Sequence, residues 1–262
     1  MKKTVIGMMV SVLCVGWASR SLATPSTQIW IPSTDVQAFN VWHLGLDNYF
    51  RSTGDGEFTA GERDPNVYDA GITVGVLPFE TVKAEIGADY LVNGTSYDDD
   101  PFYFNAKVGI PEGVLFSNSP ALAVGGFNFG TNSKKSSATR TDQNIVYGLA
   151  AETIPAFASI PSLGRFSAGY YTGNKDVLLD KNGEEANTGA LVSWDRTMSE
   201  ISDKLWVAVD YQGGKNALSG LSFGASWAFS KNVSVIFGYD IWDEPSLAGS
   251  DTFTTQLDIN FP

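Results

Sequence analysis

His43 is the only histidine in this 262-residue sequence and the side chain best suited to proton transfer. A hydrolase of the serine–histidine–acid type needs a serine and a carboxylate beside the imidazole, and the sequence pairs no serine with His43. A zinc site needs several imidazole or thiolate ligands, whereas the sequence holds one histidine and one cysteine, Cys14. We therefore expect no catalytic, cofactor-binding or metal-binding residue, and we interpret His43 as a polar residue of the interior.

Acidic side chains are concentrated in three polar segments, residues 55–64, 98–100 and 176–185. Carboxylate oxygens are ligands that hard cations such as Ca²⁺ prefer. None of the three segments has the spacing of the twelve-residue calcium-binding loop. Solvated charge on outer loops is the favoured interpretation, and weak calcium binding is the alternative.

The elements that would position these side chains follow from an alternating pattern, clearest from Leu221 to Phe261. Apolar residues fall on every second position there, in runs of about ten residues separated by short polar turns. Such runs predict strands with one apolar and one polar face. About ten residues also suffice for a tilted strand to cross a bilayer. The pattern predicts a barrel with lipid outside and polar groups inside.

Twelve segments show this alternation, which predicts an all-β, antiparallel, up-and-down transmembrane barrel of about 12 strands. They are residues 39–49, 67–76, 81–92, 102–110, 121–129, 144–151, 165–172, 188–195, 205–211, 221–229, 233–241 and 253–261. An even number of strands places both termini at the same end. The links 111–120 and 152–164 are long for tight turns, so 10 or 14 strands are alternatives.

One segment is harder to orient than the others. The fifth, 121–129, is rich in glycine and does not reveal which face is apolar. In the sixth, 144–151, we place Ile145, Tyr147 and Leu149 on the outer face.

The N-terminal residues precede the strands. Residues 1–23 resemble a signal peptide, with Lys2 and Lys3 before an apolar run and small residues near Ala23, and an uncleaved anchor is the alternative. We expect residues 24–37 to be a periplasmic leader that either partly plugs the barrel mouth or is flexible. We expect residues 38–262 to form a single barrel domain. The net charge of −12 argues against nucleic acid as a partner.

The combination of a signal, alternating strands, polar loops and an aromatic last strand resembles the bacterial outer-membrane β-barrels, porin-like in the broad sense. Leu257, Ile259 and Phe261 match the terminal pattern of these barrels, and Pro262 follows as one additional residue. The resemblance implies the outer membrane of a Gram-negative bacterium. It also implies contact with outer-membrane lipid and lipopolysaccharide, and recognition by the barrel-assembly machinery.

Charged residues on the predicted inner faces are mostly acidic, and such side chains favour cations in a pore. Inward glycines, among them Gly148, would leave space for that pore. The candidate pore-lining residues are His43, Asp47, Asp69, Lys83, Glu85, Asp89, Lys107, Arg165, Asp195, Asp210, Asp240 and Asp258.

These charges predict a narrow passive channel for small neutral or cationic solutes. The first alternative is a closed structural or surface-interaction barrel that acts through its extracellular loops, with its inner charges paired across a filled lumen. A membrane-embedded hydrolase is the second alternative.

Overall fold

The fold is described from a computed structural model of the chain. The structure describes residues 27–53, 64–137, 139–156 and 161–261. The expected signal peptide, Pro262 and most of the acidic segment 55–64 lie outside these residues.

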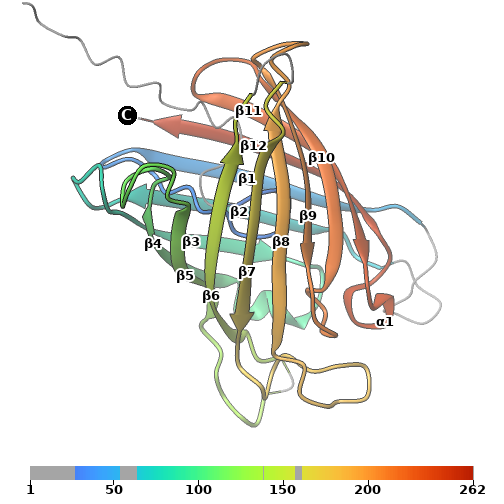
Figure 1. Cartoon of the computed structure of the whole chain (residues 1–262). Helices are drawn as coiled ribbons and strands as arrows, with labels where there is room; N and C mark the ends of the chain where they lie inside the picture. Colours follow the sequence, from blue (N-terminus) through green and yellow to red (C-terminus); the bar gives the residue numbers. More distant parts are fainter. Residues whose placement is uncertain (1–26, 54–63, 138, 157–160, 262) are drawn as a thin grey trace, which may run out of the picture.

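Twelve antiparallel strands form a closed barrel in which each strand pairs with its neighbours in sequence and β1 pairs with β12 (Figure 1). The up-and-down prediction of 12 strands is therefore confirmed. The strands are β1 (Trp42–Arg51), β2 (Val67–Gly75), β3 (Lys83–Val92), β4 (Phe102–Ile110), β5 (Ala121–Gly130), β6 (Asp142–Ile154), β7 (Gly164–Thr172), β8 (Thr188–Thr197), β9 (Leu205–Gln212), β10 (Gly220–Ala228), β11 (Val233–Trp242) and β12 (Thr252–Phe261).

The barrel has two unlike ends. β1 begins and β12 finishes at one end, which we call the terminal end. The opposite end, here the loop end, carries the connections 52–66, 93–101, 131–141, 173–187, 213–219 and 243–251. Two short helices, η1 (Ser96–Asp99) and α1 (Pro245–Ala248), lie in these connections. No helix within the described residues is long and apolar enough to cross a membrane.

Two strands, β1 and β6, differ from their predicted bounds by three residues at one end, whereas the other ends agree within two. β1 begins at Trp42 because the chain turns first at Asn40, whose φ of 59° is left-handed, and Val41 N donates a hydrogen bond to Ala38 O at 3.0 Å. β6 extends to Ile154 and takes up part of the link that was expected to begin at residue 152. This extension leaves only residues 155–163 between β6 and β7.

Two β-bulges explain why the fifth segment could not be oriented. The pairing of β4 with β5 shifts between Phe104 and Ala106, and that of β5 with β6 shifts between Phe127 and Phe129. Asn128 adopts a left-handed φ at the second irregularity, as asparagine tolerates better than most residues. The alternation of apolar residues is interrupted at these points, although the strand continues.

Large apolar side chains are exposed on the outside of every strand. One from each, in strand order, is Trp42, Ile72, Ile86, Phe104, Val124, Val146, Phe166, Val192, Val209, Phe223, Phe237 and Phe253. A continuous apolar belt of this size is unusual on a protein surrounded by water.

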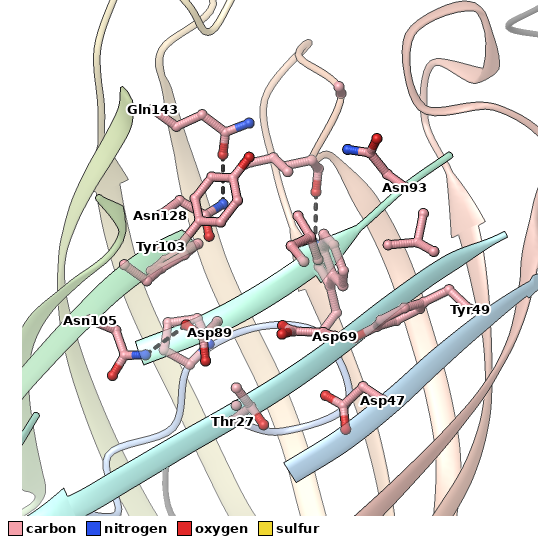
Figure 2. A pocket seen from close by; sticks show the side chains of 18 of the residues that line it. Thr27, Asp47, Tyr49, Asp69, Asp89, Asn93, Tyr103, Asn105, Asn128 and Gln143 are labelled. Atoms are coloured by element: carbon pink, nitrogen blue, oxygen red, sulfur yellow. Dashed lines mark hydrogen bonds between the residues drawn. The ribbon is translucent and has the colours of Figure 1, made fainter. Parts of the chain in front are cut away.

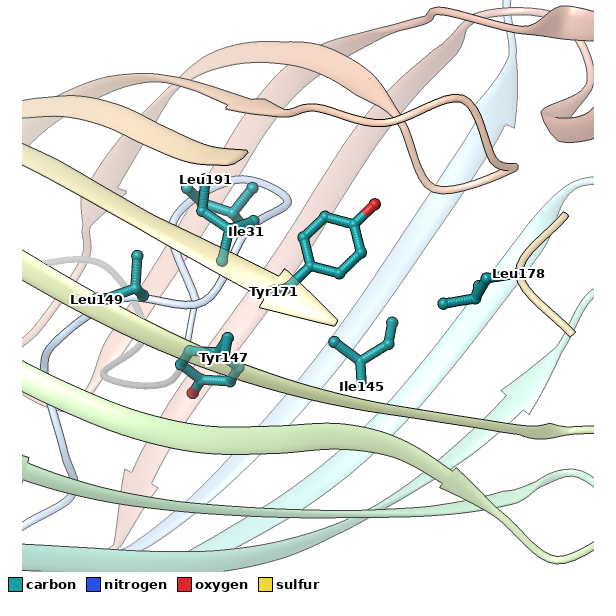
Figure 3. Packing of buried hydrophobic residues seen from close by; sticks show 7 residues of the cluster. All are labelled: Ile31, Ile145, Tyr147, Leu149, Tyr171, Leu178 and Leu191. Atoms are coloured by element: carbon teal, nitrogen blue, oxygen red, sulfur yellow. The ribbon is translucent and has the colours of Figure 1, made fainter. Parts of the chain in front are cut away.

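The outward placement of Ile145, Tyr147 and Leu149 is wrong. All three are buried inside the barrel, where they pack with Ile31, Tyr171, Leu178 and Leu191 (Figure 3). Both faces of β6 are apolar or small, so alternation alone could not choose between them. The inner face is apolar here because it receives another apolar segment of the chain, and not water.

Gly148, which shares β6 with these residues, was expected to face inward, and this was also wrong. A Cβ at Gly148 would meet nothing within 4 Å, whereas a Cβ at Gly75 would collide with the Ala38 carbonyl oxygen.

We expect Gly75→Ala to lower the free energy of unfolding by about 1–3 kcal/mol, the usual effect of overpacking, because residues 37 and 38 must shift. Gly148→Ala is the matched control and should have little effect. Urea unfolding of the refolded barrel in detergent measures both. Equal losses would show that residues 37 and 38 do not pack on β2.

Candidate functional site

The N-terminal segment, residues 27–38, lies inside the barrel. A tight turn forms at its beginning, where Gln28 N donates to Ile31 O at 2.7 Å and Thr27 pairs with Pro32. Ile29 and Ile31 are almost fully buried. For residues 27–37, the part of the expected leader that the structure describes, these contacts favour a plug over a flexible leader.

The turn 27–32, here called the anchor, is held by both apolar and polar contacts. Ile29 packs with Trp206, Ala208 and Ile236 of the barrel wall. Its backbone N–H donates to Asp210 Oδ2 at 2.7 Å, and that of Trp30 donates to the same oxygen at 3.1 Å.

Trp30 carries the anchor toward the loop end of the barrel. Its ring lies 4.8 Å from that of Trp242 and 5.6 Å from that of Tyr49, both edge to face. Its indole N–H donates to Leu218 O, in the loop between β9 and β10, at 2.9 Å. The anchor therefore reaches from one side of the lumen to the loops.

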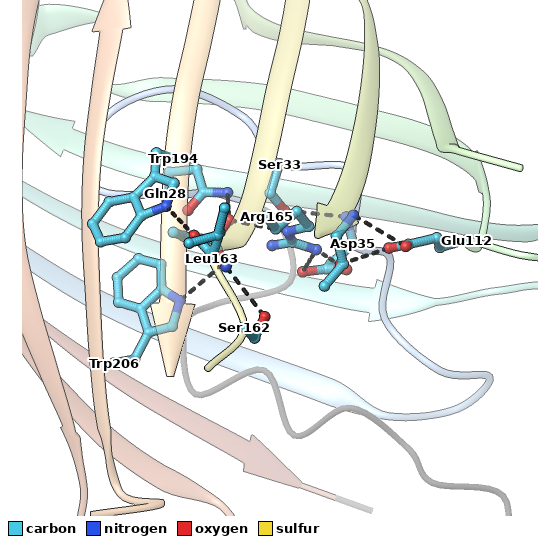
Figure 4. Close-up of polar contacts among 12 residues, drawn as sticks. Gln28, Ser33, Asp35, Glu112, Ser162, Leu163, Arg165, Trp194 and Trp206 are labelled. Atoms are coloured by element: carbon cyan, nitrogen blue, oxygen red, sulfur yellow. Dashed lines mark hydrogen bonds and ion pairs between the residues drawn. The ribbon is translucent and has the colours of Figure 1, made fainter. Parts of the chain in front are cut away.

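Residues 33–38, here called the strap, are held at the terminal end by polar contacts. Arg165 Nη1 lies 2.8 Å from Asp35 Oδ1 (Figure 4). Arg165 Nε lies 3.0 Å from Asp195 Oδ1. Gln28 Nε2 and Trp206 Nε1 also donate to Asp195, at 3.0 and 3.1 Å. One carboxylate of β8 thus connects β7, β9 and the N-terminal segment.

A second group of polar contacts fixes the strap to β3 and β4. Lys107 Nζ lies 3.2 Å from Glu85 Oε1, and both side chains are about 97–98% buried. Gln37 N donates to Glu85 Oε2 at 2.7 Å, and Lys107 Nζ donates to Ser33 O at 3.3 Å. The strap and these side chains together cover the terminal end of the lumen.

A cavity of about 550 Å³ remains on the β1–β6 side of the lumen. Carboxylates of three neighbouring strands, Asp47, Asp69 and Asp89, lie along one wall (Figure 2). Asp47 and Asp69 are directly opposite in the pairing of β1 with β2, and Asp89 follows on β3. Aromatic and amide side chains complete this wall; they are Tyr49, Tyr103, Asn93, Asn105, Asn128 and Gln143.

The three carboxylates have few partners within the chain. Asp89 accepts a hydrogen bond from Asn105 Nδ2 at 2.7 Å. Asp69 Oδ1 has no hydrogen-bond partner among the residues that the structure describes. Across the same described ranges, none of the three forms a salt bridge. Basic side chains such as Lys107 and Arg140 also line the cavity, but they pair with other carboxylates and not with these three.

No protein-family model matches this chain, and no curated protein matches it. Among solved structures, it is similar to an outer-membrane channel from Pseudomonas putida F1, with 9% identity, a TM-score of 0.48 and coverage of 86% of this chain and 95% of that one. It is also similar to the NanC porin, with 9% identity, a TM-score of 0.45 and coverage of 84% and 99%. OmpF of Salmonella typhi, in complex with daunomycin, matches with 8% identity, a TM-score of 0.41 and coverage of 84% and 96%.

The twelve candidate pore-lining residues fall into three groups. Seven of them line the cavity: His43, Asp47, Asp69, Glu85, Asp89, Lys107 and Asp258. Arg165, Asp195 and Asp210 contact the N-terminal segment instead of the cavity. Asp240 accepts a hydrogen bond from Thr252 Oγ1 at 2.7 Å, and Lys83 lies 3.6 Å from Glu80.

His43 lies on the cavity wall among polar groups of β12. Its Nδ1 is 3.0 Å from Asn260 Oδ1, and its Nε2 is 3.7 Å from Asp258 Oδ1. Ser234 Oγ donates to the other oxygen of Asp258 at 3.2 Å. The carboxylate therefore lies between serine and histidine, an order in which the imidazole does not take the serine proton. Among the described residues, no cluster of three or more His, Cys, Asp or Glu side chains is arranged to hold a metal ion.

The described acidic loops use their carboxylates for their own turns. Asp98 accepts hydrogen bonds from Asn93 N and Gly94 N. Asp180 accepts from Glu184 N at 2.9 Å and Asn182 N at 2.8 Å, and these backbone donors hold the pKa of Asp180 below its usual value. Both carboxylates thus stabilise loop conformation.

The anchor and strap residues are absent from the predicted site residues. Gln28, Asp35 and Gln37 were missed because their partners lie on strands far away in sequence. An available signal was the apolar run from Ile29 to Ile31 in a leader that is otherwise polar. Such a run is buried somewhere in most folded proteins.

Proposed function

We propose that this protein is an outer-membrane barrel that forms a narrow passive channel for small neutral or cationic solutes. The apolar belt around the closed sheet supports membrane insertion, because lipid favours apolar side chains and closure leaves no unpaired strand edge. Contact with outer-membrane lipid and lipopolysaccharide, and recognition of β12 by the barrel-assembly machinery, belong to the same proposal.

The observation that carries the choice of solute is the row of Asp47, Asp69 and Asp89 on the cavity wall. Like charges directly opposite each other on paired strands destabilise a sheet. A cation in the cavity would offset that repulsion and would be concentrated there relative to anions. A neutral solute would use the amide and tyrosine groups of the same wall.

The test is the reversal potential across a KCl gradient in a planar bilayer. We expect the wild type to prefer K⁺ over Cl⁻, and we expect the triple variant Asp47→Asn, Asp69→Asn, Asp89→Asn to lose most of this preference. Raising the salt concentration should reduce the preference of the wild type, because salt screens these charges. Glu85 is left unchanged because it already pairs with Lys107.

Asp203→Asn is the matched control, since Asp203 is an exposed acid on the turn between β8 and β9. It should leave the reversal potential unchanged. An anion-selective wild type would contradict the proposal. A conducting triple variant that retains full K⁺ preference would show that other groups select the ion.

The closed barrel that acts through its outer loops is the second candidate, and one observation favours it. Residues 27–38 occupy the lumen and cover its terminal end. This candidate predicts no conductance in repeated reconstitutions of the wild type or of any variant in which these residues are displaced.

A further inference from the structure

The anchor and the strap differ in what their removal would leave on the barrel wall. If the anchor left, Asp210, which is about 1% exposed, would lose the two backbone donors that bind its Oδ2. The apolar site of Ile29 beside Trp206 and Ile236 would be emptied as well. Both losses are costly, because they leave a buried acceptor unsatisfied and a void behind.

If the strap left, every charged side chain of the barrel wall that binds it would still have a partner on the wall. Asp35 is bound by Arg165, but Arg165 also pairs with Asp195 on β8. Ser33 and Gln37 are bound by Lys107 and Glu85, which also pair with each other. Opposite charges that stay paired avoid the large penalty for an isolated buried ion.

We propose that residues 33–38 are a movable strap that closes the terminal end of the lumen and opens it by swinging aside, while residues 27–32 stay anchored. The strap is joined to the anchor at one end and to β1 at the other, so its movement is a local one. Segments held by few apolar contacts are those that open most easily in a folded protein. This inference rests on the proposed channel function, because closure has a meaning only where solutes pass.

The contacts of the strap define what it gates. Lys107 and Glu85 bind the strap and also line the cavity, so the strap lies directly over the cavity wall at the terminal end. The three unpaired carboxylates lie farther toward the loop end on the same side. Solutes that enter from the loop end would therefore meet the acidic wall first and the strap last.

A reversible disulfide tests the movement. A Cβ at Gly109 would lie 2.7 Å from Val36 Cγ2, so Val36→Cys with Gly109→Cys brings two thiols within reach of a bond. The sequence has no cysteine besides Cys14, which lies in the expected signal peptide. We expect the oxidised double variant to conduct several-fold less in planar bilayers than the same protein after dithiothreitol.

The matched control is Gly109→Cys alone, whose conductance should not respond to dithiothreitol. A second variant, Asp35→Ala, opens the strap without new cysteines. Its open probability in planar bilayers should be several-fold higher than that of the wild type. Arg165 keeps Asp195 in that variant, so the wall stays paired.

Three results distinguish a failure of the gating strap from a failure of the proposed channel. If the oxidised staple is shown to form on a gel and conducts as well as the reduced protein, the strap is not a gate, although the channel stands. The same conclusion follows if Asp35→Ala conducts no more than the wild type. If the wild type, the reduced double variant and Asp35→Ala are all silent, the channel proposal itself is wrong and the gate falls with it.

Discussion

Phe237→Arg is expected to lower the free energy of unfolding in a lipid environment by about 2–4 kcal/mol, the range for a basic residue placed at the middle of a bilayer. Phe237 lies in the centre of β11, and its side chain is 60% exposed on the outside of the barrel. A guanidinium at this position would have to leave water for lipid. Urea titration of the barrel in phospholipid vesicles, followed by tryptophan fluorescence, measures the loss.

The control for this substitution is a second arginine on the same strand and the same face. Ile241→Arg differs from Phe237→Arg mainly in depth, since Ile241 lies next to the last residue of β11. Near the interface the expected cost falls to about 0–1 kcal/mol, because the side chain reaches water. Phe237→Ala separates the loss of packing from the cost of the charge. Equal losses at both depths would argue against a membrane around this belt.

The barrel could be predicted from the sequence because each strand repeats the same local pattern. Alternation at Phe223, Phe237 and Phe253 is visible without knowledge of any partner strand. Pairing between sequence neighbours then needs no long-range information. The strand ends that differed, such as Trp42, are set by local turns whose backbone angles the pattern does not reveal.

The orientation of β6 could not be predicted because the rule of a polar interior fails there. Ile145 and Leu149 face inward to meet Ile31, which lies more than a hundred positions earlier in the sequence. No property of the strand itself records this contact. The error and the missed anchor therefore have the same physical cause, which is an apolar segment from outside the strands inside the barrel.

The sequence was enough to predict that acidic side chains face the lumen, but not which of them line the cavity. Alternation along the strands places Asp47, Asp69 and Asp89 on the inner face, where the structure has them. Alternation does not distinguish an acidic residue that faces a cavity from one that binds another segment of the chain, as Asp195 and Asp210 do. That division depends on where residues 27–38 lie, which long-range contacts decide.

The buried pair of Lys107 and Glu85 offers the second large effect. Both side chains are almost fully buried, and their charged atoms lie 3.2 Å apart. Removal of one partner of such a pair typically costs about 3–5 kcal/mol, because the other charge stays buried. We expect Lys107→Met to cause a loss of this size, measured by urea unfolding of the refolded barrel. Glu85 would keep the hydrogen bond from Gln37 N but lose its ammonium partner.

The double variant Lys107→Met, Glu85→Gln tests whether the unpaired charge of Glu85 causes the loss of stability in Lys107→Met. A neutral amide in place of the carboxylate can still accept the Gln37 hydrogen bond, and no isolated ion remains beneath the strap. We therefore expect the double variant to regain most of the stability that Lys107→Met loses, although it has one more substitution. A double variant less stable than Lys107→Met would mean that the carboxylate of Glu85 stabilises the barrel even without the ammonium group, and that an isolated buried charge is not the cause of the loss.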